Sequence, residues 1–231
     1  MKRFYKDISV AQRGGGFALL LDGKPVLTPA KKDFVLPTNA LAEAVADEWR
    51  GQGEEINAHG MSLTRLSNTV LDGVGDARAA LAEAILRFGE NDLLCYRSDH
   101  DELSRRQREW DALLDWAADH HHARLEVTRG LNHIGQPARG LDAFRGVIAG
   151  LDDWQLAGLQ VMASITSSLV LGLAVLEGRL SAVEAFHLSR LDEAYQAEKW
   201  GMDSEAQARA KVLQGEMEAA AQLITLTRIR E

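Results

Sequence analysis

The hydrophobic pattern of this chain changes its period near residue 38, and this change constrains the fold more than any other feature of the sequence. Before it, short apolar runs alternate with turn residues, which is typical of β-strands. Phe17–Leu21 is one such run, Asp22-Gly23 is a hairpin turn dipeptide, and Pro25–Leu27 suits an edge strand. A further short strand is expected at Phe34–Leu36. The first forty residues are therefore predicted to form a small sheet.

A helical period follows this predicted sheet. Leu41, Val45 and Trp49 recur at four-residue steps, which places them on one face of a helix. The residues that bound it are Thr38 or Asn39 at its start and Gly51 and Gly53 at its end. A second helix is expected to begin at Ser62 and to stop near Gly73 and Gly75. Residues 1–75 are thus predicted to form an N-terminal α+β domain.

From Asp76 onward the pattern is almost wholly helical, and residues 76–231 are predicted to form a helical domain. After an irregular stretch, helices are expected at roughly 139–149, 153–177, 181–200 and 204–228, with Gly178 and Gly201 as C-cap glycines. The longest apolar run, Val161–Leu176, is interrupted by serine and threonine and is shorter than the ~20 residues of a membrane span. We interpret it as a helix buried on nearly all sides.

Charge and composition exclude several classes of function. The 231 residues include 34 acidic and 26 basic ones, for a formal net charge of -8, and no dense basic run is present. Binding to a phosphate backbone is therefore not expected. Cys95 is the only cysteine, which favours a reducing compartment, and the basic N-terminus is not followed by the apolar stretch of a signal peptide. A soluble protein is expected.

Sequence patterns for metal binding are weak. Glu184-x-x-His187 resembles the helical pair of di-iron carboxylate bundles, but those bundles use the pair twice and no second copy occurs. His120-His121-His122 are consecutive, and neighbouring helical residues point about 100° apart, so we expect a solvated helix end. No metal and no cofactor are predicted.

Catalytic patterns are equally weak. Gly23-Lys24 resembles the end of a phosphate-binding loop, but Ala18 replaces its first glycine and Pro25 replaces its Ser/Thr. Cys95 lies among apolar residues, which raise a thiol pKa and favour a small core residue over a nucleophile. No Gly-x-Ser-x-Gly elbow is present. No catalytic residue is predicted.

The segment Leu191–Gly201 stands out because helical spacing gathers mixed chemistry on one side of it. Asp192, Gln196 and Trp200 are predicted to share a face, with Glu193 on its edge. A carboxylate, an amide and a large indole suit a protein–protein contact, in which aromatic anchors contribute much of the energy. The alternative is that Trp200 packs under the Gly201 cap while Gln196 is solvated.

An ordered set of short motifs gives the chain a family resemblance. In order these are Arg3-Phe4-Tyr5-Lys6, Leu21-Asp-Gly-Lys-Pro-Val-Leu-Thr-Pro-Ala-Lys31, Leu36-Pro-Thr38, Leu41-Ala42 with Asp47-Glu-Trp49 and Gln52, Met61 to Thr69 with Asp72, Asp92 to Arg97, Gln107 with Trp110-Asp111, and Glu193, Gln196 and Trp200-Gly201. With these motifs the chain resembles the assembly chaperones for the alpha subunit of the F-type ATP synthase catalytic head. Ser62 and Val70-Leu71 depart from the pattern, and residues 125–153 match weakly.

This resemblance implies a non-enzymatic chaperone with a small N-terminal domain and a helical C-terminal domain. Such a protein binds the unassembled alpha subunit, shields the surface that later meets the beta subunit, and promotes assembly of the catalytic head. In this family the acidic residue before the glutamine is associated with function, and it matches Glu193 here. Because the first motif starts at Arg3, a bacterial, cytoplasmic protein is expected; eukaryotic relatives would work in the mitochondrial matrix.

Two other function classes stay open on the sequence. One is an enzyme, a hydrolase or a metal-dependent oxidoreductase, with an unrecognised site near Glu184 and His187. The other is an acidic adaptor for a different protein.

Overall fold

The computed structural model of the chain describes residues 1–130, 132–201 and 203–229. Its contacts group the chain into two compact units, Met1–Arg78 with Gln222–Glu231, and Ala79–Ala221. The sequence placed the domain boundary at 75/76 and assigned the whole C-terminus to the second domain. The two units are described separately below.

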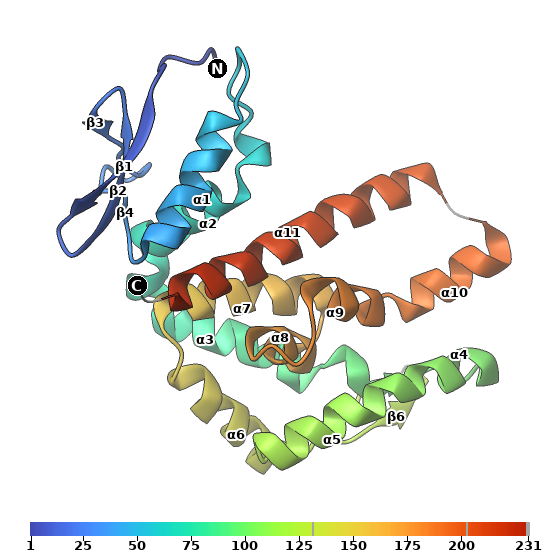
Figure 1. Cartoon of the computed structure of the whole chain (residues 1–231). Helices are drawn as coiled ribbons and strands as arrows, with labels where there is room; N and C mark the ends of the chain where they lie inside the picture. The colour runs from blue at the N-terminus through green and yellow to red at the C-terminus, as the bar shows by residue number, and fades with distance from the viewer. Residues whose placement is uncertain (131, 202, 230–231) are drawn as a thin grey trace. The chain divides into compact units, whose positions relative to one another are not determined.

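The first unit contains the small antiparallel sheet (Figure 1). Its strands are β1 Ile8–Arg13, β2 Gly16–Leu21, β3 Lys24–Pro25 and β4 Val35–Leu36. Strand β2 pairs with each of the other three. The turns on either side of β2, Gly14-Gly15 and Asp22-Gly23, have positive φ at both residues, as tight hairpins of type I′ require. The strands expected at Phe17–Leu21 and Phe34–Leu36 are confirmed, whereas β1 was not singled out from the sequence.

Helix α1, Asn39–Arg50, covers the sheet and contacts β1 and β2. Of the two candidate caps, Thr38 is the one used: its Oγ1 accepts from the backbone N–H of Leu41 at 3.2 Å. The same hydroxyl donates to the carbonyl of Leu226 at 2.8 Å, which ties the last turn of the chain into this unit. The residues buried on α1 are Leu41, Ala42, Val45 and Ala46, so the predicted stripe is confirmed except at Trp49, which is only half-buried.

The second helix does not stop at the glycines as predicted. Helix α2, Ser62–Thr69, continues through a π-helical segment, η2 Val70–Val74, into α3 Gly75–Glu90. Gly75 has ordinary right-handed helical dihedrals. A glycine lowers helix stability by only about 1 kcal/mol relative to alanine, and here it is tolerated within a continuous helical run. The start of α2 is capped by Glu48 of α1, whose carboxylate accepts from Leu63 N and Thr64 N at 2.7 and 2.8 Å.

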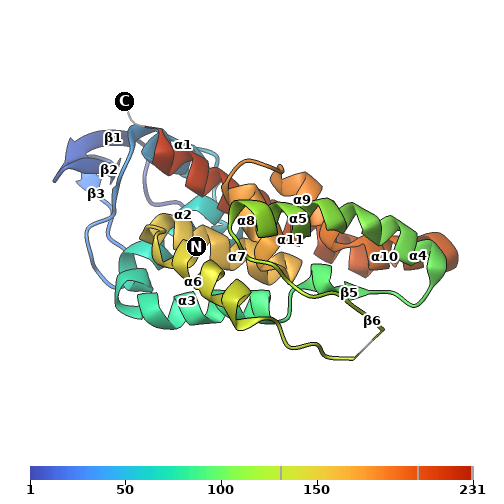
Figure 2. The same ribbon diagram turned by 90° about the horizontal axis from the view of Figure 1, so that it is seen from below.

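The second unit is helical, as predicted. It continues α3 with α4 Asp101–Arg106, α5 Asp111–His120, α6 Ala138–Ala149, α7 Asp153–Thr166, α8 Leu169–Leu176, α9 Ala182–Ser189, α10 Leu191–Trp200 and most of α11 Ser204–Arg228. Shorter elements are the 3-10 turns η1 Ala58–Gly60 in the first unit and η3 Leu93–Cys95 and η4 Gln107–Trp110 in the second, with a parallel strand pair, β5 Tyr96–Arg97 and β6 Thr128–Arg129. Every residue of α8 is buried, and this helix contacts α5, α7 and α9 (Figures 1 and 2).

Two of the predicted helices are each broken in two. The helix expected at 153–177 is interrupted at Ser167, which has φ 52°, and Ser168 then caps α8 by accepting from Leu171 N at 3.0 Å. The helix expected at 181–200 is interrupted at Arg190, between α9 and α10. Apolar periodicity does not predict such breaks, because a polar residue at the break cannot be told apart from a polar residue on the surface of a continuous helix. The expected C-cap glycines, Gly178 and Gly201, both have positive φ.

The core of the second unit contains one buried carboxyl group and the single cysteine. Asp92 Oδ2 accepts from Val170 N at 3.0 Å, at the start of α8, and burial raises the pKa of Asp92 to about 6. Burial likewise raises the pKa of the Cys95 thiol to about 12, so this cysteine is a core residue, as predicted, and is not an activated nucleophile. Among the described residues, no helix is long and apolar enough to cross a membrane.

Candidate functional site

Helix α10 has two faces with different partners, and the first of them fixes the helix to α4 and η4. Tyr195 is the one buried residue of α10, and its hydroxyl donates to Glu102 of α4 at 3.2 Å. Asp192 accepts from Nε2 of Gln107 at 2.8 Å. This face therefore holds α10 in place.

Two ion pairs reinforce the same face. The Arg106 guanidinium donates to both oxygens of Glu198 at 2.7 Å, and Lys199 lies 3.1 Å from Glu102. The hydrogen bond from Arg106 lowers the pKa of Glu198, and the hydrogen bond from Lys199 lowers the pKa of Glu102. Both carboxylates are therefore charged at neutral pH, and the bidentate pair fixes the direction of the helix more strictly than a single contact would.

The opposite face of α10 lines a groove of about 940 Å³. Glu193, Gln196 and Trp200 are all exposed there, and Trp200 is 79% exposed. Helices α9 and α11 form the other walls of the groove. Helices α10 and α11 follow one another in the chain, and the distance between them grows away from the segment that joins them (Figure 1). The groove is lined by Phe186, His187, Arg190, Glu193, Ala194, Gln196, Ala197, Glu198, Trp200, Gly201, Asp203, Ala206, Gln207, Ala210, Lys211 and Gln214.

Small side chains open this groove. Ala194 and Ala197 of α10 line it, as do Ala206 and Ala210 of α11. The first turns of α11 are exposed on all sides, although a helix in a globular protein usually gains its stability from a packed face. Small apolar side chains next to an exposed indole, within a rim of charges and amides, make a surface that can receive an apolar or amphipathic segment of another protein.

Comparisons with known proteins agree with this arrangement. A family model described as ATP12 chaperone protein matches residues 2–118, which is just over half of the chain. The chain belongs to the ATP12 chaperone family. It is 24% identical over 214 residues to the mitochondrial protein atp12 of Schizosaccharomyces pombe, an alignment that covers 87% of this chain and 74% of that protein.

Two solved structures resemble this ATP12 family member over nearly its whole length. The crystal structure of Atp12 from Paracoccus denitrificans has a TM-score of 0.93 and 41% identity, with 98% of each chain covered. The Agrobacterium tumefaciens protein Atu1473 has a TM-score of 0.93 and 44% identity, with 97% of this chain and 85% of that chain covered. The family resemblance and the predicted fold class, a small α+β part followed by a helical part, are both confirmed.

The four residues predicted as the contact in this ATP12 family member do not share one face. Glu193, Gln196 and Trp200 line the groove, whereas Asp192 is turned toward Gln107 on the anchored side. Glu193 also lies 3.2 Å from Arg190, so its carboxylate is part of an ion pair at the groove wall. Trp200 does not pack under Gly201, because most of its surface is exposed.

The wall contributed by α11 was missed from the sequence. Ala206 and Ala210, with Gln207 and Gln214, repeat at steps of three and four and so share one side of that helix. This repeat of small and amide residues was a usable signal, but a polar helix face is ordinarily solvated. These residues line a groove only because α10 lies beside this side of α11, and the sequence does not show that position.

The Glu184–His187 pair of this family member is engaged in other contacts. Glu184 completes a capping box, because its carboxylate accepts from Ser181 N at 2.8 Å while Ser181 Oγ accepts from Glu184 N at 3.2 Å. Within the ranges that the structure describes, neither Glu184 nor His187 belongs to a group of three or more metal-ligating side chains. His187 lines the groove instead.

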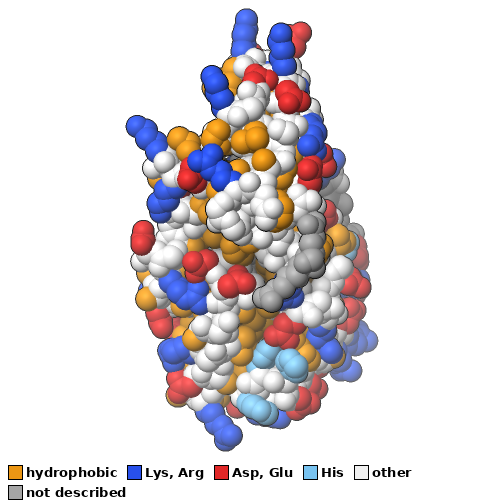
Figure 3. Space-filling model, turned by 60° about the vertical axis from the view of Figure 1, so that its left-hand side comes forward, with side chains coloured by type: hydrophobic (Ala, Val, Ile, Leu, Met, Phe, Trp, Pro, Cys, Tyr) orange, Lys and Arg blue, Asp and Glu red, His pale blue; other side chains and the backbone are white. Residues whose placement is uncertain are grey.

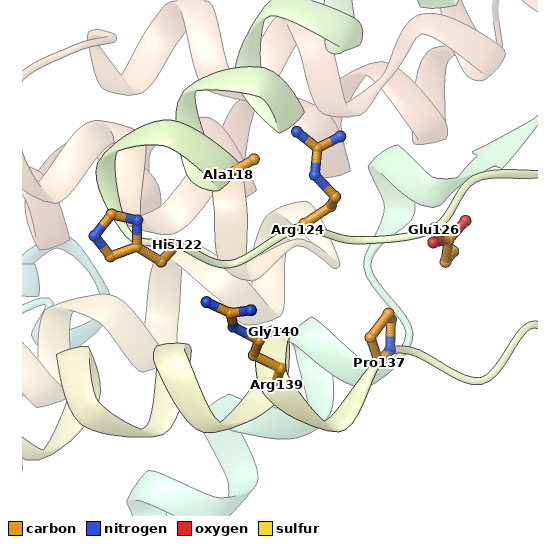
Figure 4. A pocket seen from close by; sticks show the side chains of 7 residues that line it. All are labelled: Ala118, His122, Arg124, Glu126, Pro137, Arg139 and Gly140. Carbon is orange, nitrogen blue, oxygen red and sulfur yellow. The ribbon is translucent and has the colours of Figure 1, made fainter.

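A second, smaller hollow of about 370 Å³ lies between the end of α5 and the start of α6 (Figure 4). His122, Arg124 and Arg139 line it together with Glu126. All four side chains are exposed, and the hollow is more basic than the groove. Part of its lining, Glu126 and Arg139 included, belongs to the stretch that matches the family weakly. Its small size and its charge make it a poorer receptor for an apolar segment.

Proposed function

We propose that this protein is a non-enzymatic chaperone that binds the unassembled alpha subunit of the ATP synthase catalytic head through the groove between α9, α10 and α11. It shields the surface that later meets the beta subunit and so promotes assembly of the head. The observation that carries this proposal is the exposed Trp200 beside an alanine-lined groove on a rigidly anchored helix. Membership of the ATP12 chaperone family and the ordered sequence motifs support it.

The physical basis is the chemistry of obligate subunit interfaces. Such interfaces are more apolar than the rest of a protein surface, and when exposed alone they favour aggregation. A chaperone has to cover that surface and then give way to the larger native interface. A groove with one large aromatic anchor and a polar rim suits a contact of moderate strength, because the rim adds specificity more than affinity.

The residues divide into contact residues and a positioning residue. Trp200 is the aromatic anchor, and Glu193 and Gln196 supply a charge and an amide at the groove wall. Asp192 acts through Gln107, by holding α10 in the orientation that presents the other three. No cofactor is needed for binding and release, since displacement by the beta subunit completes the exchange.

We place this chaperone in the bacterial cytoplasm. Its single cysteine is buried and has no second cysteine in the chain to pair with, which suits a reducing compartment, and its two near-full-length structural relatives are bacterial proteins. Eukaryotic relatives would act in the mitochondrial matrix.

Co-expression with a cognate alpha subunit, in cells that lack the beta subunit, tests the proposal. We expect the chaperone to raise the amount of soluble alpha subunit and to co-purify with it. Glu193→Lys should abolish most of this gain, because it reverses a charge at the groove wall and repels Arg190.

The matched control is Glu109→Lys, which makes the same charge change at an exposed position outside the groove. It should behave like the unmodified chain. If the alpha subunit gains no solubility and does not co-purify, the proposed partner is wrong. If both variants lose binding equally, the partner is bound by non-specific electrostatic attraction to the acidic chain, and the groove is not its binding site. Capture of a different protein through the groove would favour the adaptor alternative.

A further inference from the structure

Helix α5 ends in a group of histidines that the sequence led us to expect as a solvated end. His120 is its last residue, His121 is the C-cap, and His122 has φ 58°, which turns the chain away. The rings of His120 and His121 nevertheless lie 4.8 Å apart, at an interplanar angle of 77°. Trp116, one turn earlier, stacks on His120 and meets His121 edge-on. Figure 3 shows histidine side chains gathered on the surface of the molecule.

A carboxylate from another helix faces both imidazoles. Glu177, the C-cap of α8, places Oε2 at 3.1 Å from Nε2 of His120 and Oε1 at 3.2 Å from Nε2 of His121. The three potential ligand atoms all lie within 4.8 Å of one another. Each oxygen of Glu177 therefore lies next to one ring nitrogen. Because 55 residues separate His121 from Glu177, spacing along the sequence does not predict this arrangement.

One atom of this group lacks a hydrogen-bond partner. The side chain of His121 is more than nine-tenths buried, and its Nε2 has no hydrogen bond although Glu177 Oε1 is only 3.2 Å away. Buried polar atoms are rarely left in this state, because an unmade hydrogen bond costs free energy. A neutral imidazole that carries its proton on Nδ1 presents a lone pair at Nε2, which a metal ion can accept.

We propose that His120, His121 and Glu177 bind one zinc ion. In a tetrahedral zinc site with bonds of about 2.0–2.1 Å, neighbouring ligand atoms lie about 3.3 Å apart. Each ring nitrogen lies at a similar distance, 3.1 and 3.2 Å, from a different oxygen of Glu177, and the three potential ligand atoms lie within 4.8 Å of one another, so a bound ion would draw them closer together. An ion between the three atoms would occupy the lone pair of the buried His121 nitrogen. Two imidazoles and one carboxylate suit zinc among the divalent cations, with water as the fourth ligand, because the side chain of His120 is 59% exposed.

The ends of two helices favour a cation at the same place. Helix α5 ends at His120 and α8 ends at Leu176, immediately before Glu177. The carboxyl end of a helix carries partial negative charge, so two such ends stabilise a positive ion. The zinc ion thereby links the end of α5 to the end of the buried helix α8. This site is separate from the groove and does not depend on the proposed function.

Calorimetric titration of the tag-free, full-length chain with zinc chloride tests this site. We expect one zinc ion per chain. His120→Ala and Glu177→Gln should each weaken binding by about tenfold or more, because each removes one of three ligands. The control variants His122→Ala and His187→Ala remove histidines outside the group and should bind zinc like the unmodified chain. Absence of zinc binding, or equal binding by Glu177→Gln, would overturn the proposal.

Thermal unfolding tests the site independently, because the effect of zinc on the melting temperature is measured in several chains, including the unmodified one. Because zinc binds the folded chain, it should raise the melting temperature of the unmodified chain and of His122→Ala, and a chelator should reverse the rise. The rise should be absent in His120→Ala. Cobalt in place of zinc should give the intense visible absorption of a tetrahedral centre. A melting temperature that is unchanged by zinc in every variant would indicate a plain ion pair and would refute the site.

Discussion

Helices α8 and α10 belong to the same unit but have opposite environments. Every residue of α8 is buried, whereas α10 has a single buried residue, Tyr195. The interior of the unit is built on α8, and the backbone N–H of Val170 at its start donates a capping hydrogen bond to the buried Asp92. Helix α10 is held by polar contacts along one side and leaves the other side open. Stability should therefore depend on α8, and partner binding on α10.

The sharpest test of this division is a cavity in α8. Leu173→Ala removes a fully buried side chain, and we expect the free energy of unfolding to fall by about 3 kcal/mol, because the surrounding helices cannot close the space. Denaturant unfolding measures the loss. At a temperature where the variant is still folded, its affinity for the alpha subunit should be unchanged. Leu173→Met nearly conserves volume and is the control, with a loss below about 1.5 kcal/mol. Loss of partner binding by folded Leu173→Ala would contradict the division.

The converse test is truncation of the exposed indole. Trp200→Ala should weaken alpha-subunit binding by about 2 kcal/mol, or roughly thirtyfold, because aromatic anchors dominate such contacts. Its stability should change by less than about 0.5 kcal/mol, since the side chain is 79% exposed. Binding is measured by calorimetry or surface plasmon resonance, and stability by thermal unfolding.

Val212→Ala is the control for this experiment. Val212 is an apolar residue that is 62% exposed on α11 and is not part of the groove lining. Its truncation should leave both affinity and stability unchanged. A large stability loss in Trp200→Ala would instead mean that the indole supports the fold.

Much of the fold was predictable because it depends on local signals. The change of hydrophobic period located the sheet, Thr38 was one of the two proposed caps of the first helix, and Gly178 and Gly201 marked helix ends correctly. Apart from the missed strand β1, the assignment of the C-terminal residues and the half-buried Trp49, the errors concern breaks and continuations within helices. Gly73 and Gly75 did not end a helix, whereas Ser167 and Arg190 did, because the outcome there depends on partners distant in the sequence, such as Asp92 at the start of α8.

The candidate site was predictable only in part, for a related reason. Helical spacing correctly placed Gln196 and Trp200 on one side of α10, but it could not show that Asp192 has a partner in Gln107. The groove itself depends on where α11 returns after Gly201, and the zinc ligands depend on where α8 ends. Both are long-range arrangements, and no spacing rule within one helix contains them.

The smallest expected effect concerns the ion pair that orients α10. Arg106→Glu places a carboxylate beside both Glu198 and Glu102, and it should weaken alpha-subunit binding by less than Trp200→Ala does. Both side chains of the pair are accessible to water, so the melting temperature should change little. The double variant Arg106→Glu/Glu198→Arg restores opposite charges and should recover part of the lost affinity, which a double-mutant cycle measures. Arg106 lies outside the groove lining, and Glu198 lines the groove but is not one of the three proposed contact residues, so recovery would indicate that the pair acts by orienting the helix. If the double variant binds no better than the single one, the anchored face does not control the open face, and the two faces of α10 act independently.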